Sequence, residues 1–166
     1  RSAVPAGLFE PSHLERYASV LERLAIPYKV DKRGRATRND LPVEGINAAT
    51  GLVTTARDLA RFDAALDTIL LLDETRNASW TNAAGNDQRM LPTGLGWFVQ
   101  SYKGERVVWH FGLVPNAYSS LYLKIPSRRI SVILLANSDG LSPPFQLQLR
   151  NVTRSLFDNL FLKSFL

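Results

Sequence analysis

The sequence predicts an α+β fold, in which an antiparallel β-sheet meander has helices on its flanks. Two observations indicate this class. Four strand-like runs follow one another through short turns, and segments of helical periodicity lie before and after them. The runs cover residues 95–102, 106–111, 117–125 and 130–137. Helices and strands are thus segregated along the chain, which favours an antiparallel sheet over a parallel one.

Two helices are expected before the sheet. Residues 11–24 carry apolar side chains at helical spacing and stop ahead of Pro27. Farther on, Thr55 and Asp58 fit a capping box, with a hydroxyl at the helix start and an acid three residues later. An apolar stripe runs through this helix and consists of Leu52, Ala56, Leu59, Phe62, Leu66 and Ile69. A shorter helix is expected over residues 75–80.

Turn residues separate the strand-like runs. The Lys-Gly pair at 103–104 predicts a hairpin turn between the first two runs. The Pro-Asn pair at 115–116 predicts the next turn, because Asn tolerates a left-handed backbone. Residues 28–38 indicate a short ribbon earlier in the chain.

The later runs differ in how their apolar residues are spaced. Polar Ser120, Tyr122 and Lys124 alternate with leucine and isoleucine, so one face is expected to be buried and the other wetter. Residues 130–136 are almost all apolar, which predicts a central strand covered from both sides. Residues 145–161 are expected to form a helix across the sheet. Its apolar stripe would be Phe145, Leu149, Val152, Leu156 and Leu160.

Composition limits the classes of function. A chain of 166 residues with 45% hydrophobic residues is expected to form a single domain over residues 1–166. No apolar run approaches the ~20 residues that span a bilayer. The sequence has no cysteine and two distant histidines, so no disulfide scaffold, metal site or other cofactor is expected.

The net charge of +5 owes much to basic residues between positions 29 and 38. One interpretation is a surface for nucleic acid, and the other is a solvated hairpin. No aromatic residues interleave with these charges, so we expect no nucleic-acid partner. Salt-dependent DNA binding that is lost when Lys32 and Arg35 are neutralised would favour the first interpretation instead.

Four short motifs follow one another along the chain. Residues 51–62 contain Gly-Leu, Thr-Thr and Asp-Leu-Ala, and residues 94–97 are Gly-Leu-Gly-Trp. His110-Phe111-Gly112 stands at the end of one predicted strand, and residues 134–137 (Leu-Leu-Ala-Asn) end another. Any one of these motifs is common by chance. Their order and spacing together make the pattern fairly specific.

In this order the motifs resemble those of the serine β-lactamase and penicillin-binding-protein superfamily, most closely the class C β-lactamases and related esterases. The resemblance implies the α/β subdomain of that fold and acyl transfer from a serine. Its substrate would be a small-molecule ester, peptide or β-lactam, and its location periplasmic or secreted.

The resemblance also implies roles for five residues. His110 would bind a substrate carboxylate or support proton transfer, and the backbone N–H of Leu113 would form half of an oxyanion hole. Gly112 would let substrate approach the strand. Phe111 and Asn137 would contact substrate, and Phe111 lacks the hydroxyl of the usual threonine, which favours an ester or peptide over a β-lactam. A lone strand histidine can instead be a hydrogen-bonded structural residue.

The motifs that start this chemistry are missing from the sequence. No serine is followed by lysine three positions later, and no tyrosine by asparagine two positions later. Both motifs precede the His-x-Gly strand in the family, so we expect this chain to be the C-terminal fragment of a longer hydrolase, inactive alone. The alternative is a non-catalytic binding or regulatory module of the same fold. An exposed sheet would also allow a homodimer.

Overall fold

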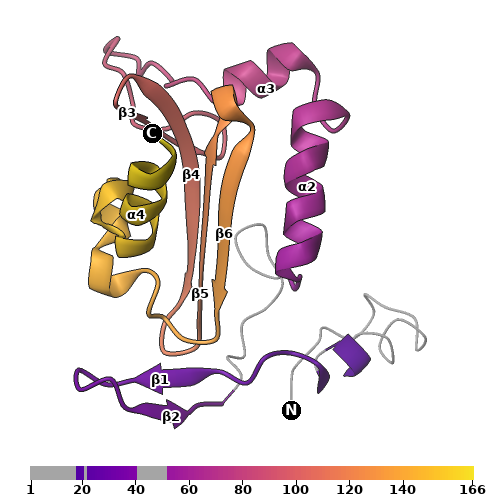
Figure 1. The fold of residues 1–166 in the computed structure, drawn as a ribbon, viewed down its shortest axis with the longest axis vertical. Helices are drawn as coiled ribbons and strands as arrows, with labels where there is room; N and C mark the ends of the chain where they lie inside the picture. The colour runs from indigo at the N-terminus through magenta and orange to yellow at the C-terminus, as the bar shows by residue number, and fades with distance from the viewer. Residues whose placement is uncertain (1–17, 21, 41–51) are drawn as a thin grey trace.

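The computed structural model describes residues 18–20, 22–40 and 52–166. A four-stranded sheet stands at its centre, with α2 beside one face and α4 beside the other (Figure 1). The helix expected over residues 11–24 lies mostly outside the described residues, although 18–20 are helical. None of the helices in the described ranges is long and apolar enough to cross a bilayer.

The sheet is an antiparallel meander with the order β3-β4-β5-β6, which confirms the predicted fold class. Its strands are β3 (Phe98–Tyr102), β4 (Glu105–Val114), β5 (Tyr118–Ile125) and β6 (Ile130–Ala136). Lys103 and Gly104 both have positive φ angles, 48° and 81°. Two such residues make the turn whose twist suits a tight hairpin, as predicted. The first strand begins at Phe98, three residues later than expected.

The run predicted to form a central strand, residues 130–136, is β6. β6 pairs with β5 alone, so it is an edge strand among the described strands, and β4 and β5 are central. The apolar composition of β6 is explained by the helices that cover its two faces. Ile130, Val132 and Leu134 pack into the core on the α4 side, while the Ser131 hydroxyl bonds to α2 on the opposite side. Helices can cover both faces of a strand whether or not strands flank it.

The single helix predicted over residues 145–161 is also wrong. Three short 3₁₀ turns precede the true helix: η2 (Pro143–Phe145), η3 (Leu147–Leu149) and η4 (Val152–Arg154). Helix α4 covers Leu156–Phe165. Gln146 and Arg150 have left-handed φ angles of 52° and 60°, which interrupt a continuous α-helix. The buried apolar residues of this region are consequently Leu147, Val152 and Leu162. Of the predicted stripe, Val152 is buried, whereas Leu149, Leu156 and Leu160 are exposed.

Helix α2 (Ala56–Thr68) begins where the capping box predicted. The Thr55 hydroxyl accepts a hydrogen bond from the backbone N–H of Asp58 at 3.1 Å. Of the predicted stripe, Leu66 is buried, but Leu52 and Ile69 are 82% and 86% exposed because they lie beyond the two helix ends. Helix α3 (Asp73–Ser79) follows, slightly earlier than predicted.

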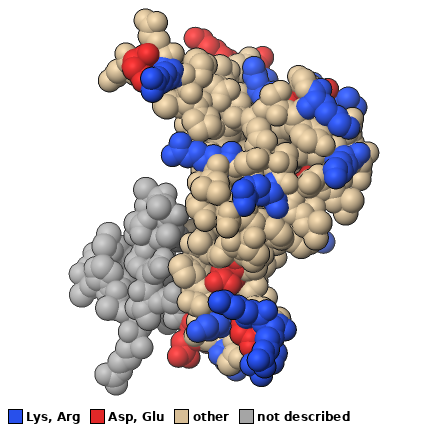
Figure 2. Space-filling model, turned by 90° about the vertical axis from the view of Figure 1, so that its left-hand side faces the viewer, with Lys and Arg blue, Asp and Glu red and all other residues tan. Residues whose placement is uncertain are grey.

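The predicted ribbon over residues 28–38 is a hairpin of β1 (Tyr28–Val30) and β2 (Ala36–Arg38). The Asp31 carboxylate holds its turn by accepting from the backbone N–H groups of Arg33 and Arg35, at 2.8 and 2.9 Å. These bonds hold the pKa of Asp31 below its usual value. Basic side chains gather on this hairpin at one end of the molecule (Figure 2).

The larger core lies between the sheet and α4. It consists of Val107, Trp109, Leu121, Leu123, Ile125, Leu147, Val152 and Leu162, all fully buried. A smaller cluster of Trp80, Val99 and Val108 lies on the opposite side of the sheet. The face of β5 expected to be wetter is not uniformly so, because Lys124 is 0% exposed.

Asp158 in α4 is also fully buried, and neither carboxylate oxygen has a hydrogen-bond partner. Burial raises the pKa of Asp158 to about 7, although the nearby Ser155 hydroxyl acts in the opposite direction. Between the ordinary Asp pKa of 3.8 and about 7, the unfolded carboxyl is ionised while the folded one keeps its proton. The free energy of unfolding therefore falls as pH rises through this window.

We predict that Asp158→Asn raises the free energy of unfolding by roughly 2–4 kcal/mol at about pH 8 and has little effect near pH 4. The amide cannot ionise, so the buried charge is never formed. Urea unfolding at several pH values measures the difference. Asp87→Asn, at a side chain that is 61% exposed, is the control and should leave the pH dependence unchanged. Parallel stability curves for Asp158→Asn and the unmodified chain would contradict the prediction.

Candidate active site

The His-x-Gly motif lies inside a long strand. β4 continues to Val114, so the expectation that this strand ends near Phe111 is wrong. On one side, β5 pairs with the whole motif and places Tyr122 opposite His110 and Ser120 opposite Gly112. On the other side, the pairing with β3 stops at Trp109. The motif therefore has a backbone edge that no described strand occupies.

His110 is exposed, yet its ring is partly desolvated by neighbouring aromatic rings. The ring centroids of Phe98 and Phe111 lie 5.7 and 6.2 Å from that of His110. Desolvation lowers the pKa of His110, and a backbone hydrogen bond with Phe111 opposes this effect. The imidazole is consequently neutral at neutral pH and can accept a proton.

Phe111 belongs partly to the core. Its ring stacks with those of Trp109 and Phe98, at centroid distances of 6.2 and 5.9 Å. The ring is half-buried and packs against the apolar cluster on the α4 side. An aromatic residue in the middle of the motif therefore has a packing role of its own.

Gly112 provides room for the Ser120 side chain. A Cβ atom at Gly112 would lie 2.5 Å from the Ser120 Oγ atom, which is too close without movement of the serine. Ser120 is not among the predicted site residues, although strand register alone places it opposite the glycine. Leu113, the predicted oxyanion donor, follows directly and is 40% exposed.

Asn137 lies at the same end of the sheet as Leu113. Leu113 pairs with Ser119, and Ser119 pairs with Ala136, so one row across three strands leads to Asn137. The Asn137 amide donates to the Ile26 carbonyl at 2.8 Å. The Asn137 backbone carbonyl accepts a hydrogen bond from the backbone N–H of Tyr28 at 2.7 Å. These bonds tie the chain before β1 to the sheet.

A charged cluster that sequence analysis missed lies on the α2 side of the sheet. The Lys124 Nζ atom is 2.9 Å from both the Asp63 and the Asp67 carboxylates of α2. The hydroxyls of Tyr122 and Ser131 both donate to Asp63. Burial, followed by the hydrogen bond to Asp63, raises the pKa of Tyr122 far above its usual value.

Simple spacing could have indicated this cluster. Two aspartates four residues apart share one face of a helix, and Tyr122 and Lys124, two apart, share one face of a strand. The cluster also contacts the motifs. Tyr122 lies opposite His110 and packs edge-to-face against Trp97 of the second motif, at a centroid distance of 5.1 Å.

No group of three metal-binding side chains occurs among the residues that the structure describes. The motif itself offers a neutral imidazole, backbone donors on an open strand edge and nearby hydroxyls. These groups can orient a carbonyl substrate and stabilise an oxyanion.

Comparison with known families gives the classification. The family model described as beta-lactamase matches residues 4–156, which is most of the chain. This chain belongs to the beta-lactamase family. A search of curated proteins finds no match. The resemblance that the four motifs indicated is thereby confirmed at the level of the family.

Proposed function

We propose that this chain forms the substrate-facing sheet of a serine acyl-transfer hydrolase whose Ser-x-x-Lys motif lies in sequence preceding it. The observation that carries the proposal is the open edge of β4 beside His110, Gly112 and Leu113. A substrate carbonyl can approach this edge because the pairing of β4 with β3 stops at Trp109, before the motif. Family membership supports the same chemistry.

Each motif residue has a role in this proposal. The Leu113 N–H donates to the developing oxyanion together with the amide of the nucleophilic serine. His110, neutral at working pH, accepts a proton or binds a polar substrate group at the same edge. Gly112 and Asn137 shape the surface around the substrate. Phe111 offers no hydroxyl for a β-lactam carboxylate, so an ester or peptide is the proposed substrate.

The test uses the full-length protein that contains this chain. We expect His110→Ala to lower kcat/KM for a chromogenic ester by roughly 10²-fold, within the usual range for a proton-transfer group. His110 is exposed, so the free energy of unfolding should change little. Steady-state kinetics and urea unfolding measure the two effects separately.

His13→Ala, at the other histidine of the sequence, is the matched control and should keep full turnover. A chromogenic cephalosporin, assayed alongside, distinguishes a β-lactam substrate from an ester. Unchanged turnover in His110→Ala, combined with a large loss of stability, would refute the catalytic role. Substrate binding without turnover by the unmodified protein would favour a non-catalytic binding module.

For the chain alone we predict no hydrolysis above buffer and association with itself. The proposed nucleophile is not part of it, and the outer edge of β6 has no partner among the described strands. An open edge invites pairing with a second copy. Solution mass and ester hydrolysis measure both properties. A strictly monomeric chain would contradict the association, and turnover abolished by mutating one of its own serines would contradict the placement of the nucleophile.

A further inference from the structure

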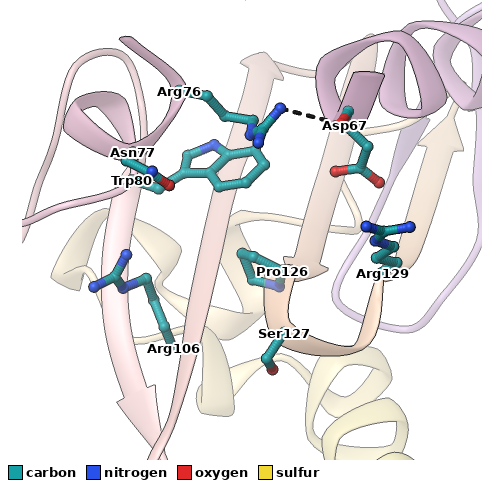
Figure 3. A pocket seen from close by; sticks show the side chains of 8 residues that line it. All are labelled: Asp67, Arg76, Asn77, Trp80, Arg106, Pro126, Ser127 and Arg129. Carbon is teal, nitrogen blue, oxygen red and sulfur yellow. Dashed lines mark hydrogen bonds between the residues drawn. The ribbon is translucent and has the colours of Figure 1, made fainter. Parts of the chain in front are cut away.

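A second site lies at the other end of the sheet. A pocket of about 290 Å³ opens where β4 begins and β5 ends. Its lining comes from the end of α2, from α3 and from the turn between β5 and β6 (Figure 3). The lining residues are Asp67, Arg76, Asn77, Trp80, Arg106, Pro126, Ser127 and Arg129. Arg106 precedes His110 by four residues, about 13 Å along an extended strand, so the pocket is separate from the motif.

The pocket has an excess of positive charge. Three guanidinium groups, from Arg76, Arg106 and Arg129, line it together with one carboxylate, that of Asp67. This carboxylate already binds the buried Lys124 ammonium at 2.9 Å. It is therefore occupied and does not neutralise the arginines.

The three arginines differ in how they are held. Arg76 is fixed, since it donates to the Asp67 carbonyl at 3.0 Å and pairs with Asp73, and its side chain is 17% exposed. Within the described part of the chain, the side chains of Arg106 and Arg129 make no ion pair and donate no hydrogen bond. The pocket is thus lined by one preorganised guanidinium group and by two that have no partner among the described residues.

Trp80 adds a donor that has no acceptor. The residue is 4% exposed, and its indole Nε1 atom has no hydrogen-bond partner. A buried donor left unpaired costs about 1–3 kcal/mol, so polar groups of this kind usually have a partner. Figure 3 shows the Trp80 ring between Arg76 and Pro126, within the group of lining residues. This nitrogen is shielded from solvent, so a ligand oxygen would supply an acceptor once the side chains over it move.

We propose that this pocket binds a small phosphate-bearing anion. The guanidinium fork matches phosphate oxygens in paired hydrogen bonds, and a charge near −2 suits several arginines better than a monovalent carboxylate does. The volume lies at the lower end of ligand pockets, so the ligand is of the size of a phosphomonoester or pyrophosphate. This binding does not depend on the hydrolase reaction proposed for the His-x-Gly strand.

The test measures binding of inorganic pyrophosphate to the whole chain by calorimetry at fixed ionic strength. The double variant Arg106→Gln and Arg129→Asn removes both free cations. Asn suits position 129 because this residue has a left-handed φ of 52°. We expect binding to weaken at least tenfold. Arg89→Gln, at an arginine with an 87% exposed side chain that is not part of the pocket lining, is the control and should bind like the unmodified chain.

Trp80→Phe removes the indole donor together with one of the two fused rings, so urea unfolding is measured beside binding. We expect it to weaken pyrophosphate binding severalfold while circular dichroism stays unchanged. Orthophosphate and sulfate, titrated in parallel, separate phosphate recognition from general anion binding. Equal affinity in the double variant and the Arg89 control would overturn the proposal, as would equal affinity for sulfate and pyrophosphate. Absence of binding at millimolar pyrophosphate would also overturn it.

Discussion

The buried ammonium of Lys124 sets the main constraint on this structure. A fully buried lysine on a central strand must be compensated, because removing one partner of such a pair leaves an isolated charge in the interior at a cost of about 3–5 kcal/mol. Asp63 and Asp67, one turn apart on α2, supply the compensation. Two carboxylates exceed one ammonium, and the hydroxyls of Tyr122 and Ser131 stabilise the extra charge on Asp63. The position and rotation of α2 follow from these contacts.

The same cluster connects the family motifs, which lie far apart in the sequence. Helix α2 carries the end of the motif at residues 51–62. Trp97 of the Gly-Leu-Gly-Trp motif packs on Tyr122, and Tyr122 lies opposite His110 of the His-x-Gly motif. Asp67 also lines the arginine-rich pocket, and because its carboxylate pairs with Lys124 it does not pair with Arg106 or Arg129 there. The proposed catalytic edge and the proposed anion pocket thus lie at opposite ends of the sheet. The cluster around Lys124 contacts residues of both.

Local chemistry in the sequence predicted part of this architecture. The positive φ angles at Lys103 and Gly104 and the cap at Thr55 depend on neighbouring residues, so they could be recognised directly. The edge position of β6 could not be recognised from the sequence, because helices can cover the two faces of an edge strand as fully as those of a central strand. The break at Gln146 depends on backbone angles that no residue there requires. Burial of Lys124 needed partners 57 and 61 residues away. The predicted roles of His110 and Leu113 rest on the family resemblance, and the structure adds the open edge beside them.

Hydrogen exchange in Lys124→Met, followed by mass spectrometry, tests most directly whether this buried ammonium holds α2 on the sheet. Methionine fills a similar volume but leaves Asp63 and Asp67 without their cation. If Lys124 holds α2 on the sheet, α2 loses protection well before β4 and β5 do, while Lys163→Met, at an exposed lysine of α4, leaves the exchange pattern unchanged. Equal protection of α2 in Lys124→Met and in the unmodified chain would contradict it.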